Sequence, residues 1–401
     1  HLDCPDDPYG AVVPPLYQTA TFGQPTASEF GEYDYTRTAN PTRTLLERQL
    51  ADLEGGAYGS TFASGMAAIT VLTRLVEAGE EIIAGDDLYG GTVRLLEQVR
   101  RRQGIGVHYA DTTDLNCVRA ALTRRTRLIL IETPTNPLFR ISDIRSIAQL
   151  AYEAGALLAV DNSMLSPCFQ RPLALGADLV IHSATKFLCG HSDVTAGAVI
   201  TNDPVLHERI AFLQNAEGAG LSPFESWLLL RGLKTLALRV ERQNQSATRI
   251  ARFLESQHAV RKVYHPSLTN HPGHEIHRRQ SEGDGAVVSF TTGDAELSAS
   301  IIEATKLFTI AVSFGSVGST ISLPFRMSHA SIPEALKGRL APPADLVRIS
   351  VGIEDVDDLQ EDLDQAFTSA GRLRLARLHR QDEAESENTH QRWSAASAAT
   401  K

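Results

Sequence analysis

DLVIHSATKFLCGHSD, residues 178–193, is the stretch around which the rest of the chain is organised. An apolar run that leads into His182 predicts a strand, and Ser183 and Thr185 lie three and one positions before Lys186. Hydroxyls can donate hydrogen bonds to phosphate oxygens, and a lysine amine can condense with an aldehyde carbon. The stretch therefore suits a phosphorylated aldehyde, although a strand end and a turn with a solvated lysine is the plainer interpretation of these residues alone.

Apolar strands alternate with helices on both sides of this stretch. Buried strands are predicted at residues 81–84, 127–132, 157–160, 178–181 and 196–201, with helical segments between several of them. Such alternation predicts a mainly parallel sheet with both faces covered by helices. Ligands bind at the carboxyl ends of the strands in sheets of this kind. Because Asn136, Asp161, Ser183 and Lys186 all follow strand ends, we expect them to line one crevice.

The residues TFASGMAA at 61–68 run into an apolar helix. A Ser-Gly step at a helix start exposes free backbone N–H groups at the positive end of the helix dipole, which suits a phosphate. A helix cap followed by a close-packed glycine explains the same residues equally well. Both interpretations stay open for this segment.

The chain is predicted to comprise four parts: an extended N-terminal arm, a large α/β domain, a smaller α/β domain and a disordered tail or linker, at residues 1–40, 41–220, 221–371 and 372–401. The large domain is expected to begin with a helix capped by Thr42. Two helices are predicted at 227–238 and 240–254, at the start of the smaller domain.

Composition excludes several functional classes. The net charge of −10 over 401 residues argues against a nucleic-acid surface or a polybasic membrane anchor, and no apolar run approaches the ~20 residues of a membrane span. The first residues are polar and do not resemble a signal peptide. The four cysteines lack CxxC spacing, which is typical of a reduced, cytoplasmic protein without a structural zinc site.

Two polar features of the C-terminal half require an explanation. Arg348 lies inside an otherwise apolar strand predicted at 346–351, and a buried guanidinium needs an anion. A structural carboxylate and a substrate carboxylate are equally compatible with this position. The remaining feature is a set of histidines whose spacing matches no metal template, so we expect a solvated loop and no metal site at His265, His271, His274 and His277.

The motifs taken together resemble the Cys/Met-metabolism family of pyridoxal-phosphate (PLP) enzymes, which have the aspartate aminotransferase fold (fold type I). From about Tyr9 to Phe367 the chain contains, in the order of that family, YTR-x-x-NPT, SGMAA, GDDLYGG, ETPTNP, VDNS, HSATKF-x-x-GHSD and RISVGIED. Within the family, EGAGLSPFESWLLLRGLKT and FTIAVSFGSVGSTISLP look most like the plant-type cystathionine β-lyases. The resemblance implies a large PLP-binding domain with a mainly parallel sheet and a smaller C-terminal α/β domain.

The resemblance also implies roles for individual residues around the cofactor. Lys186 would hold pyridoxal 5′-phosphate as a Schiff base and then act as the general base, and Tyr89 would stack on the ring and shuttle a proton. Asp161 would pair with the pyridine nitrogen, where an anion keeps that nitrogen protonated. The phosphate would be bound by the hydroxyls and backbone of four residues: Gly65, Met66, Ser183 and Thr185.

The substrate and the partner follow from the same resemblance. Asn136, Ser313 and Arg348 would hold the α-carboxylate of a small amino acid. Tyr35 and Arg37 would reach into the site of a neighbouring subunit, Arg37 to the phosphate and Tyr35 to cofactor and substrate. The expected assembly is therefore a dimer with shared active sites, and a homotetramer by analogy with the family.

The reaction expected is α,β-elimination of L-cystathionine or a related cysteine S-conjugate, giving a thiol, pyruvate and ammonia, as in methionine biosynthesis. Family members that work at Cγ often carry a glutamate immediately before the serine, and Val312 stands there in this chain. Gly318 and Thr320 replace bulkier residues near the entrance. Two alternatives stay open: a cysteine C–S lyase domain of a multidomain synthase with a larger, carrier-bound substrate, and γ-synthase or γ-lyase chemistry.

Overall fold

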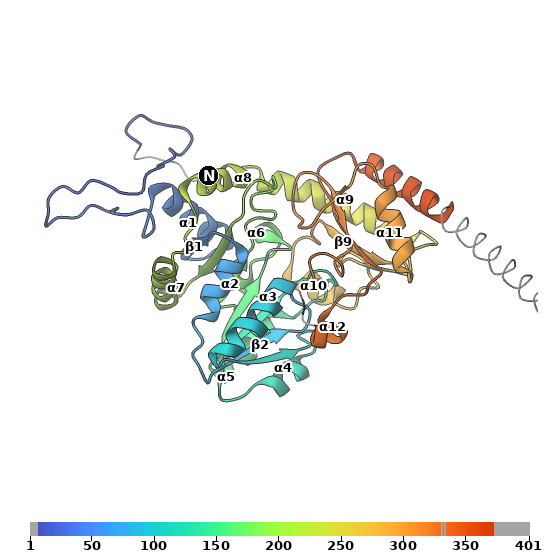
Figure 1. Cartoon of the computed structure of the whole chain (residues 1–401), viewed down its shortest axis with the longest axis horizontal. Helices are drawn as coiled ribbons and strands as arrows, with labels where there is room; N and C mark the ends of the chain where they lie inside the picture. Colours follow the sequence, from blue (N-terminus) through green and yellow to red (C-terminus); the bar gives the residue numbers. More distant parts are fainter. Residues whose placement is uncertain (1–6, 330–331, 333, 373–401) are drawn as a thin grey trace, which may run out of the picture.

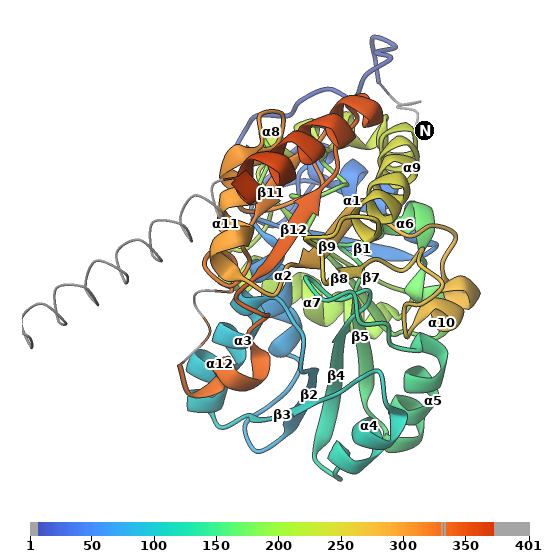
Figure 2. The same cartoon turned by 90° about the vertical axis from the view of Figure 1, so that its right-hand side faces the viewer.

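A computed structural model describes residues 7–329, 332 and 334–372 of the chain. The chain folds around two sheets with helices packed on both (Figures 1 and 2). The larger sheet has seven strands in the spatial order β1 (Tyr58–Phe62), β7 (Gly197–Thr201), β6 (Leu179–His182), β5 (Leu157–Asp161), β4 (Thr126–Glu132), β2 (Glu81–Gly85) and β3 (Gly106–Ala110). Only β7 runs antiparallel to its neighbours, so the predicted, mainly parallel sheet is confirmed.

The strands of the larger sheet are apolar because helices cover them on both sides. The central strands β2, β4 and β6 contain only buried residues, apart from Arg127 in β4. The apolar stripe of α5, formed by Ile144, Ile147 and Leu150, packs against one face of the sheet. The helical segments associated with this sheet are α1 (Pro41–Glu54), α2 (Gly65–Thr73), α3 (Gly90–Leu95), a π-helical turn (Leu96–Arg100), a 3-10 turn (Arg101–Gln103), α4 (Leu115–Ala121), α5 (Ile144–Ala154), α6 (Ser166–Phe169), a second 3-10 turn (Pro172–Leu175) and α7 (Pro204–Glu217).

The smaller sheet has five strands in the spatial order β10 (Thr309–Ile310), β11 (Thr320–Ser322), β12 (Leu346–Ser350), β9 (Val287–Thr291) and β8 (Lys262–Tyr264). Its apolar core includes Phe290, Val347 and Ile349. The helices of this half are α8 (Pro223–Leu233), α9 (Leu236–Glu255), α10 (His274–Gln280), α11 (Ala295–Ala304), α12 (Glu334–Leu340) and a final helix at residues 356–372. Because α8 packs on α1 and α9 packs on β8 and β9, these two helices connect the halves (Figure 1).

Two predicted helix boundaries are wrong. The cap of α1 is Asn40, whose side chain accepts a hydrogen bond from the Thr42 N–H, so Thr42 already lies inside the helix. The break between α8 and α9 falls at Lys234 and Thr235 and not after residue 238. It falls there because side chains of Thr235 and Arg239 bond the Gly232 carbonyl, which a continuous helix would have used itself.

The expectation of a solvated histidine loop is also wrong in part. His265 and His277 are buried, at 0% and 1% exposure, and His277 Nε2 lies 3.4 Å from a carboxylate oxygen of Asp284. Burial of the segment against the Gly283 carbonyl and Phe139 explains why the loop is ordered there. Among the described residues, no three side chains form a metal-ligating group, and no helix there is long and apolar enough to span a membrane. The predicted tail lies outside the described residues except for residue 372.

Candidate active site

A cavity of about 480 Å³ opens at the carboxyl ends of β4, β5 and β6. Those strand ends lie side by side, because Glu132 is paired with Asp161 and Asp161 with Ile181 in the sheet register. Most of the predicted site residues line this cavity: Gly65, Met66, Tyr89, Asn136, Asp161, Ser183, Thr185, Lys186, Ser313 and Arg348. The predicted crevice is thus present, with walls contributed by both halves of the chain.

Lys186 lies in the turn that follows β6, and its amine points into the cavity. The Nζ atom donates a hydrogen bond to the Ser313 hydroxyl and lies 4.8 Å from the centre of the Phe314 ring. Burial, together with the positive charge of Arg348, lowers the pKa of Lys186 from 10.5 to about 8, and Asp161 opposes the shift. A lysine in this state has a substantial neutral fraction near neutral pH and can act as a nucleophile or a base.

Asp161 ends β5 and shares the floor of the cavity with a second carboxyl group, that of Glu132. Burial and the charge of Asp161 raise the pKa of Glu132 well above 4.5. Burial also raises the pKa of Asp161, but hydrogen bonds from Ser163 and the nearby His182 and Lys186 oppose that rise. The hydrogen bonds from Ser163 and the charge of Lys186 thus favour the anionic form of Asp161.

The start of α2 and the end of β6 form a cradle suited to a phosphate. Ser64 caps α2 by accepting a hydrogen bond from the Ala67 N–H, which leaves the N–H groups of Gly65 and Met66 without intrahelical partners. A Cβ atom on Gly65 would lie 3.0 Å from the Cβ of Ser183, so a larger residue would fill the cradle. The Thr185 hydroxyl also bonds both the N–H and the carbonyl of Ala196, so it helps to hold the turn in place.

Arg348 lines the same cavity. Its guanidinium donates to Asn136 Oδ1 and to the Ser313 carbonyl, each at 2.8 Å, and it is buried. No salt bridge to Arg348 occurs among the residues that the structure describes, and its nearest hydrogen-bond acceptors are neutral. Burial lowers its pKa to about 10. No described carboxylate lies within salt-bridge distance of Arg348, although the charge of the nearby Glu132 opposes the lowering of its pKa, so the geometry favours a bound anion as its direct partner.

Ser313 contacts both Lys186 and Arg348. Its backbone has φ +80°, a left-handed conformation that residues other than glycine seldom adopt. That conformation directs the hydroxyl to Lys186 and the carbonyl to Arg348. Strained backbone of this kind persists where the surrounding structure holds it in place, often at a functional site.

Comparison with known proteins agrees with this geometry. The family model described as "Cys/Met metabolism PLP-dependent enzyme" matches residues 2–368. The chain belongs to this family. It is 54% identical over 367 residues to a chloroplastic cystathionine beta-lyase of Arabidopsis thaliana, covering 92% of this chain and 79% of that protein. It is 49% identical to a cystathionine gamma-lyase of Bacillus subtilis (strain 168), covering 90% and 96%. A solved cystathionine gamma synthase from Xanthomonas oryzae pv. oryzae has a TM-score of 0.90 and 40% identity, covering 92% and 95%.

As a member of the Cys/Met metabolism PLP-dependent enzymes, the chain uses pyridoxal 5′-phosphate as its cofactor. The residues present fit that group. The Gly65 cradle is open for a phosphate, the neutral fraction of the Lys186 amine suits an aldehyde, and the Asp161 carboxylate suits a protonated ring nitrogen. Tyr89 lines the same cavity and is 39% exposed, so its ring is available for stacking.

Tyr35 and Arg37 do not line this cavity. They lie on the arm, where Arg37 donates to the Asn215 carbonyl and side chain, at 2.9 and 2.8 Å, and its guanidinium lies 5.5 Å from the centre of the Tyr35 ring. Figure 1 shows the arm in dark blue, projecting away from the body of the chain. This placement is compatible with a contribution to a neighbouring subunit, which stays a prediction for both residues.

The sequence analysis missed three residues of the site. Glu132 accepts hydrogen bonds from the backbone N–H groups of Asn136, at 2.6 Å, and Tyr89, at 3.3 Å, so it ties two predicted site residues together. Phe314 lies beneath both Lys186 and the Arg348 guanidinium. Ser163 accepts from the Ser183 N–H at 2.6 Å. Glu132 begins the ETPTNP motif at the end of an apolar strand and Ser163 ends the VDNS motif, so both lay within motifs but were assigned no role, whereas Phe314 had no signal of its own.

Proposed function

We propose that this chain is a PLP-dependent carbon–sulfur β-lyase that converts L-cystathionine, or a related cysteine S-conjugate, to a thiol, pyruvate and ammonia. The observation that carries the proposal is the shared contact of Lys186 and Arg348 with Ser313, which places a base and a carboxylate site next to each other in one cavity. The names of relatives at 54% and 50% identity, both cystathionine beta-lyases, support the reaction type.

Arg348 and Asn136 orient the substrate. The guanidinium offers a planar, two-pronged set of donors that matches the α-carboxylate, and it is held by neutral acceptors that a carboxylate can displace without leaving a buried charge unpaired. Holding the carboxylate at Arg348 keeps the substrate Cα within reach of the Lys186 amine, because both side chains contact Ser313 and the Phe314 ring. Orientation of this kind accounts for a large share of the rate acceleration by enzymes.

Lys186 moves the proton. When bound, the cofactor supplies an electron-poor ring that makes the substrate Cα–H acidic and accepts its charge. The free Lys186 amine would take the Cα proton onto Nζ, and the Ser313 hydroxyl beside it would accept a hydrogen bond while Nζ holds that proton. Loss of the sulfur from Cβ as a thiol requires a proton, and Nζ and the Tyr89 hydroxyl are the donors available at the cavity. Water then completes the release of pyruvate and ammonia.

Val312 supports elimination at Cβ rather than at Cγ. It lines the cavity entrance and is 57% exposed. An apolar side chain there offers no base for removing a proton from Cβ of the substrate, which γ-chemistry requires. Gly318 and Thr320 line a hollow that adjoins this entrance, together with Val312 and Thr185, so the sulfur-bearing part of the substrate has room beyond the site. The γ-lyase at 49% identity keeps γ-elimination as the second candidate.

A product assay with L-cystathionine tests the proposal. Pyruvate and homocysteine are the expected products of the purified PLP-loaded protein. Formation of 2-oxobutyrate and cysteine would show that the protein catalyses γ-elimination and not β-elimination. Failure to cleave cystathionine, together with pyruvate formation from a bulky S-alkyl cysteine, would indicate that the substrate is a larger cysteine conjugate.

We further infer a dimer with shared active sites, a homotetramer and a cytoplasmic location. The dimer is supported by the distance of Tyr35 and Arg37 from their own chain's cavity and by the exposed apolar residues of the arm and of α7 and α8, namely Val12, Val13, Phe30, Val205, Phe212 and Phe224. The location is supported by the free state of Cys117, Cys168 and Cys189. Light scattering and cell fractionation test these two inferences.

A further inference from the structure

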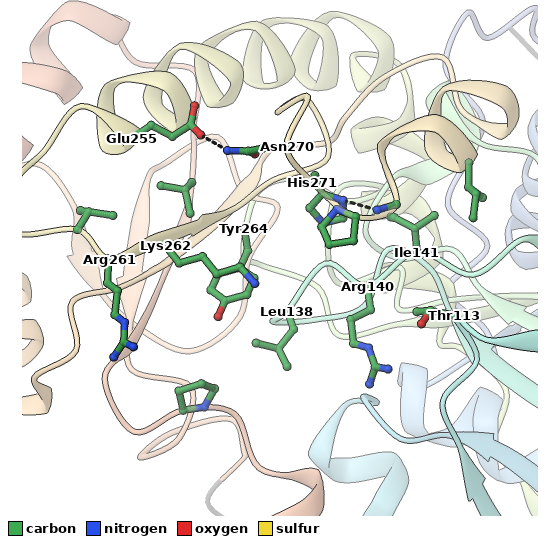
Figure 3. Close-up of a pocket in the computed structure, with 16 residues that line it drawn as sticks. Thr113, Leu138, Arg140, Ile141, Glu255, Arg261, Lys262, Tyr264, Asn270 and His271 are labelled. Carbon is green, nitrogen blue, oxygen red and sulfur yellow. Dashed lines mark hydrogen bonds between the residues drawn. The ribbon is translucent and has the colours of Figure 1, made fainter. Parts of the chain in front are cut away.

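A second cavity, of about 820 Å³, lies between the two halves of the chain and shares no lining residue with the candidate active site. One wall comes from the loop after β4, and the other comes from β8 and the segment that follows it. Figure 3 shows Arg140 and Ile141 facing Arg261, Lys262 and Tyr264 across the opening. The remaining labelled residues around it are Thr113, Leu138, Glu255, Asn270 and His271.

The cavity has positive charge available for a ligand. Arg261 and Lys262 are exposed, and neither takes part in a salt bridge among the described residues, in a chain whose net charge is −10. Arg140 is already occupied, because it pairs with Asp86 at 2.7 Å and with Asp111. The Glu255 carboxylate, which also lines the cavity, accepts a hydrogen bond from Asn270 at 2.9 Å. Two unpaired cations at one rim attract an anion.

Much of the rest of the lining is apolar, beside the polar Thr113, Asn270 and His271. The Tyr264 ring is half-buried beneath the Lys262 amine, whose Nζ lies 4.6 Å from the ring centre. Around it the cavity is lined by Leu138, Ile141, Val263, Pro272, Ile276 and Pro343. A ligand that matches both parts has an anionic group at one end and a planar ring at the other.

A second protein chain is a weaker match for this cavity. None of the large apolar side chains that are exposed in the described residues lines this cavity. A subunit interface would present such side chains at its centre. The basic rim and the hollow shape instead suit a small molecule.

The wall between the two cavities is a single short loop. Asn136 faces the active site and bonds Arg348, whereas Leu138 and Arg140 face the second cavity. Hydrogen bonds between Thr135 and Arg140 close this loop: the Thr135 N–H donates to the Arg140 carbonyl at 3.1 Å, and the Arg140 N–H donates to Thr135 Oγ1 at 2.8 Å. A displacement of one side of so small a loop moves the other side as well.

The smaller sheet supplies a second connection. Tyr264 is paired in register with Ser289, and Ser289 is paired with Arg348 on the next strand. Residues opposite each other on neighbouring strands project to the same face of a sheet. The ring that lines the second cavity and the guanidinium that lines the active site thus stand in one row of the same sheet.

We propose that the second cavity binds a small organic anion carrying a planar ring, and that its occupancy changes the affinity of the active site for the substrate carboxylate. Binding requires Arg261 and Lys262 for the anionic group and Tyr264 for the ring. The change in affinity is carried by the loop 133–140, which holds Asn136 against Arg348. The effect is reciprocal, so substrate and anion alter each other's affinity by the same factor.

The test uses the PLP-loaded protein and adenosine 5′-monophosphate (AMP) as the probe, with inorganic phosphate and adenosine as the two partial probes. Calorimetry should show one AMP per chain, bound more tightly than either partial probe, with no change in the visible absorbance of the cofactor. An Arg261→Ala/Lys262→Ala double variant should bind AMP at least tenfold more weakly. A Lys234→Ala/Arg252→Ala variant, which removes the same two charge types from exposed positions outside the cavity, should bind AMP as the wild type does.

Absence of AMP binding at millimolar concentration, or equal binding by the two double variants, would overturn the site. A KM for L-cystathionine that shifts at saturating AMP in the wild type, but not in Arg261→Ala/Lys262→Ala, would support the coupling. Saturated AMP binding with an unchanged KM would overturn the coupling between the two cavities but would still support the second binding site. Calorimetry requires no catalysis, so a failure of the proposed reaction and a failure of this inference are separately visible.

Discussion

The Lys186 amine is strongly affected by its surroundings in the active site. Burial and the Arg348 charge lower its pKa from 10.5 to about 8, so the amine loses its proton as the pH rises through about 8. Only the neutral amine attacks an aldehyde. We therefore expect the rate at which the cofactor-free protein takes up pyridoxal phosphate to rise about tenfold per pH unit below pH 7 and to level off above about pH 8. Stopped-flow absorbance measures this rate.

The reference for that pH profile is an exposed lysine, whose amine keeps its ordinary pKa. A rate that kept rising to pH 10 would show that the amine retains its ordinary pKa in solution and would contradict the effect of burial. A Lys186→Ala variant should take up no cofactor covalently and should show no turnover, which confirms that the profile reports this amine.

At Arg348 the prediction concerns substrate affinity. Arg348→Lys keeps the charge but loses the two-pronged geometry, so the KM for the amino acid should rise roughly 10- to 100-fold, equivalent to about 1.5–3 kcal/mol for charged hydrogen bonds. Arg326→Lys is the matched control, because Arg326 is exposed and its contact with Glu296 lies outside the cavity. Equal kinetics of the two variants, measured by steady-state assay, would remove Arg348 from substrate binding.

At the scale of elements, the junction between α2 and β6 decides where a phosphate can bind. A Cβ at position 65 would lie 3.0–3.1 Å from the Ser183 Cβ, Cα and Oγ atoms, so Gly65→Ala should push the two elements apart. We expect at least a tenfold weaker affinity for pyridoxal phosphate, measured by equilibrium dialysis. Gly371→Ala, in the final helix and with no atom within 4 Å of the added Cβ, should leave that affinity unchanged.

The comparison of these two variants distinguishes a general loss of stability from a local loss of phosphate binding. A Gly65→Ala protein with normal cofactor affinity would show that α2 does not contact the phosphate. Thermal unfolding without cofactor gives the second readout, because a general loss of stability would lower the Tm of the cofactor-free variant, whereas a purely local effect appears only when cofactor is present.

At the scale of the whole molecule, the arm predicts complementation between subunits. If Tyr35 and Arg37 complete a neighbour's site, Arg37→Ala and Lys186→Ala proteins should each be nearly inactive as homodimers. Refolded or co-expressed together, they should form mixed dimers in which one site carries both lesions and the other carries neither. Activity should then recover to about a quarter of the wild-type value, since half of the dimers are mixed and each has one intact site.

Mixed dimers isolated with two different affinity tags provide the control for this experiment. No recovery in a verified mixed dimer would place Arg37 in its own chain's site or outside catalysis. Within one chain, Arg37 does not line the cavity that contains Lys186. It lines a separate hollow beside the arm.

The sequence by itself determined the elements and most of the site. Strands such as β2 and β4 are continuous apolar runs because both faces are buried, and that property is visible along the chain. Lys186, Asp161 and Gly65 were predictable because each follows or precedes such an element within a few residues. The exact helix caps were less predictable, because Asn40 and Thr42 are both good cap residues. The arm favours Asn40, since the Tyr17 carbonyl accepts a hydrogen bond from the Asn40 side-chain amide.

Only the tertiary structure decided the partners of Arg348 and Lys186. Arg348 meets Asn136 across 212 positions, and Lys186 meets Ser313 across 127, because the smaller sheet packs its β11–β12 side over the ends of β4 to β6. The Phe314 ring beneath two cations and the second cavity both depend on that packing. Periodicity along a chain reports which face of an element is buried, but distances between elements are determined by how their surfaces fit, which no local pattern encodes.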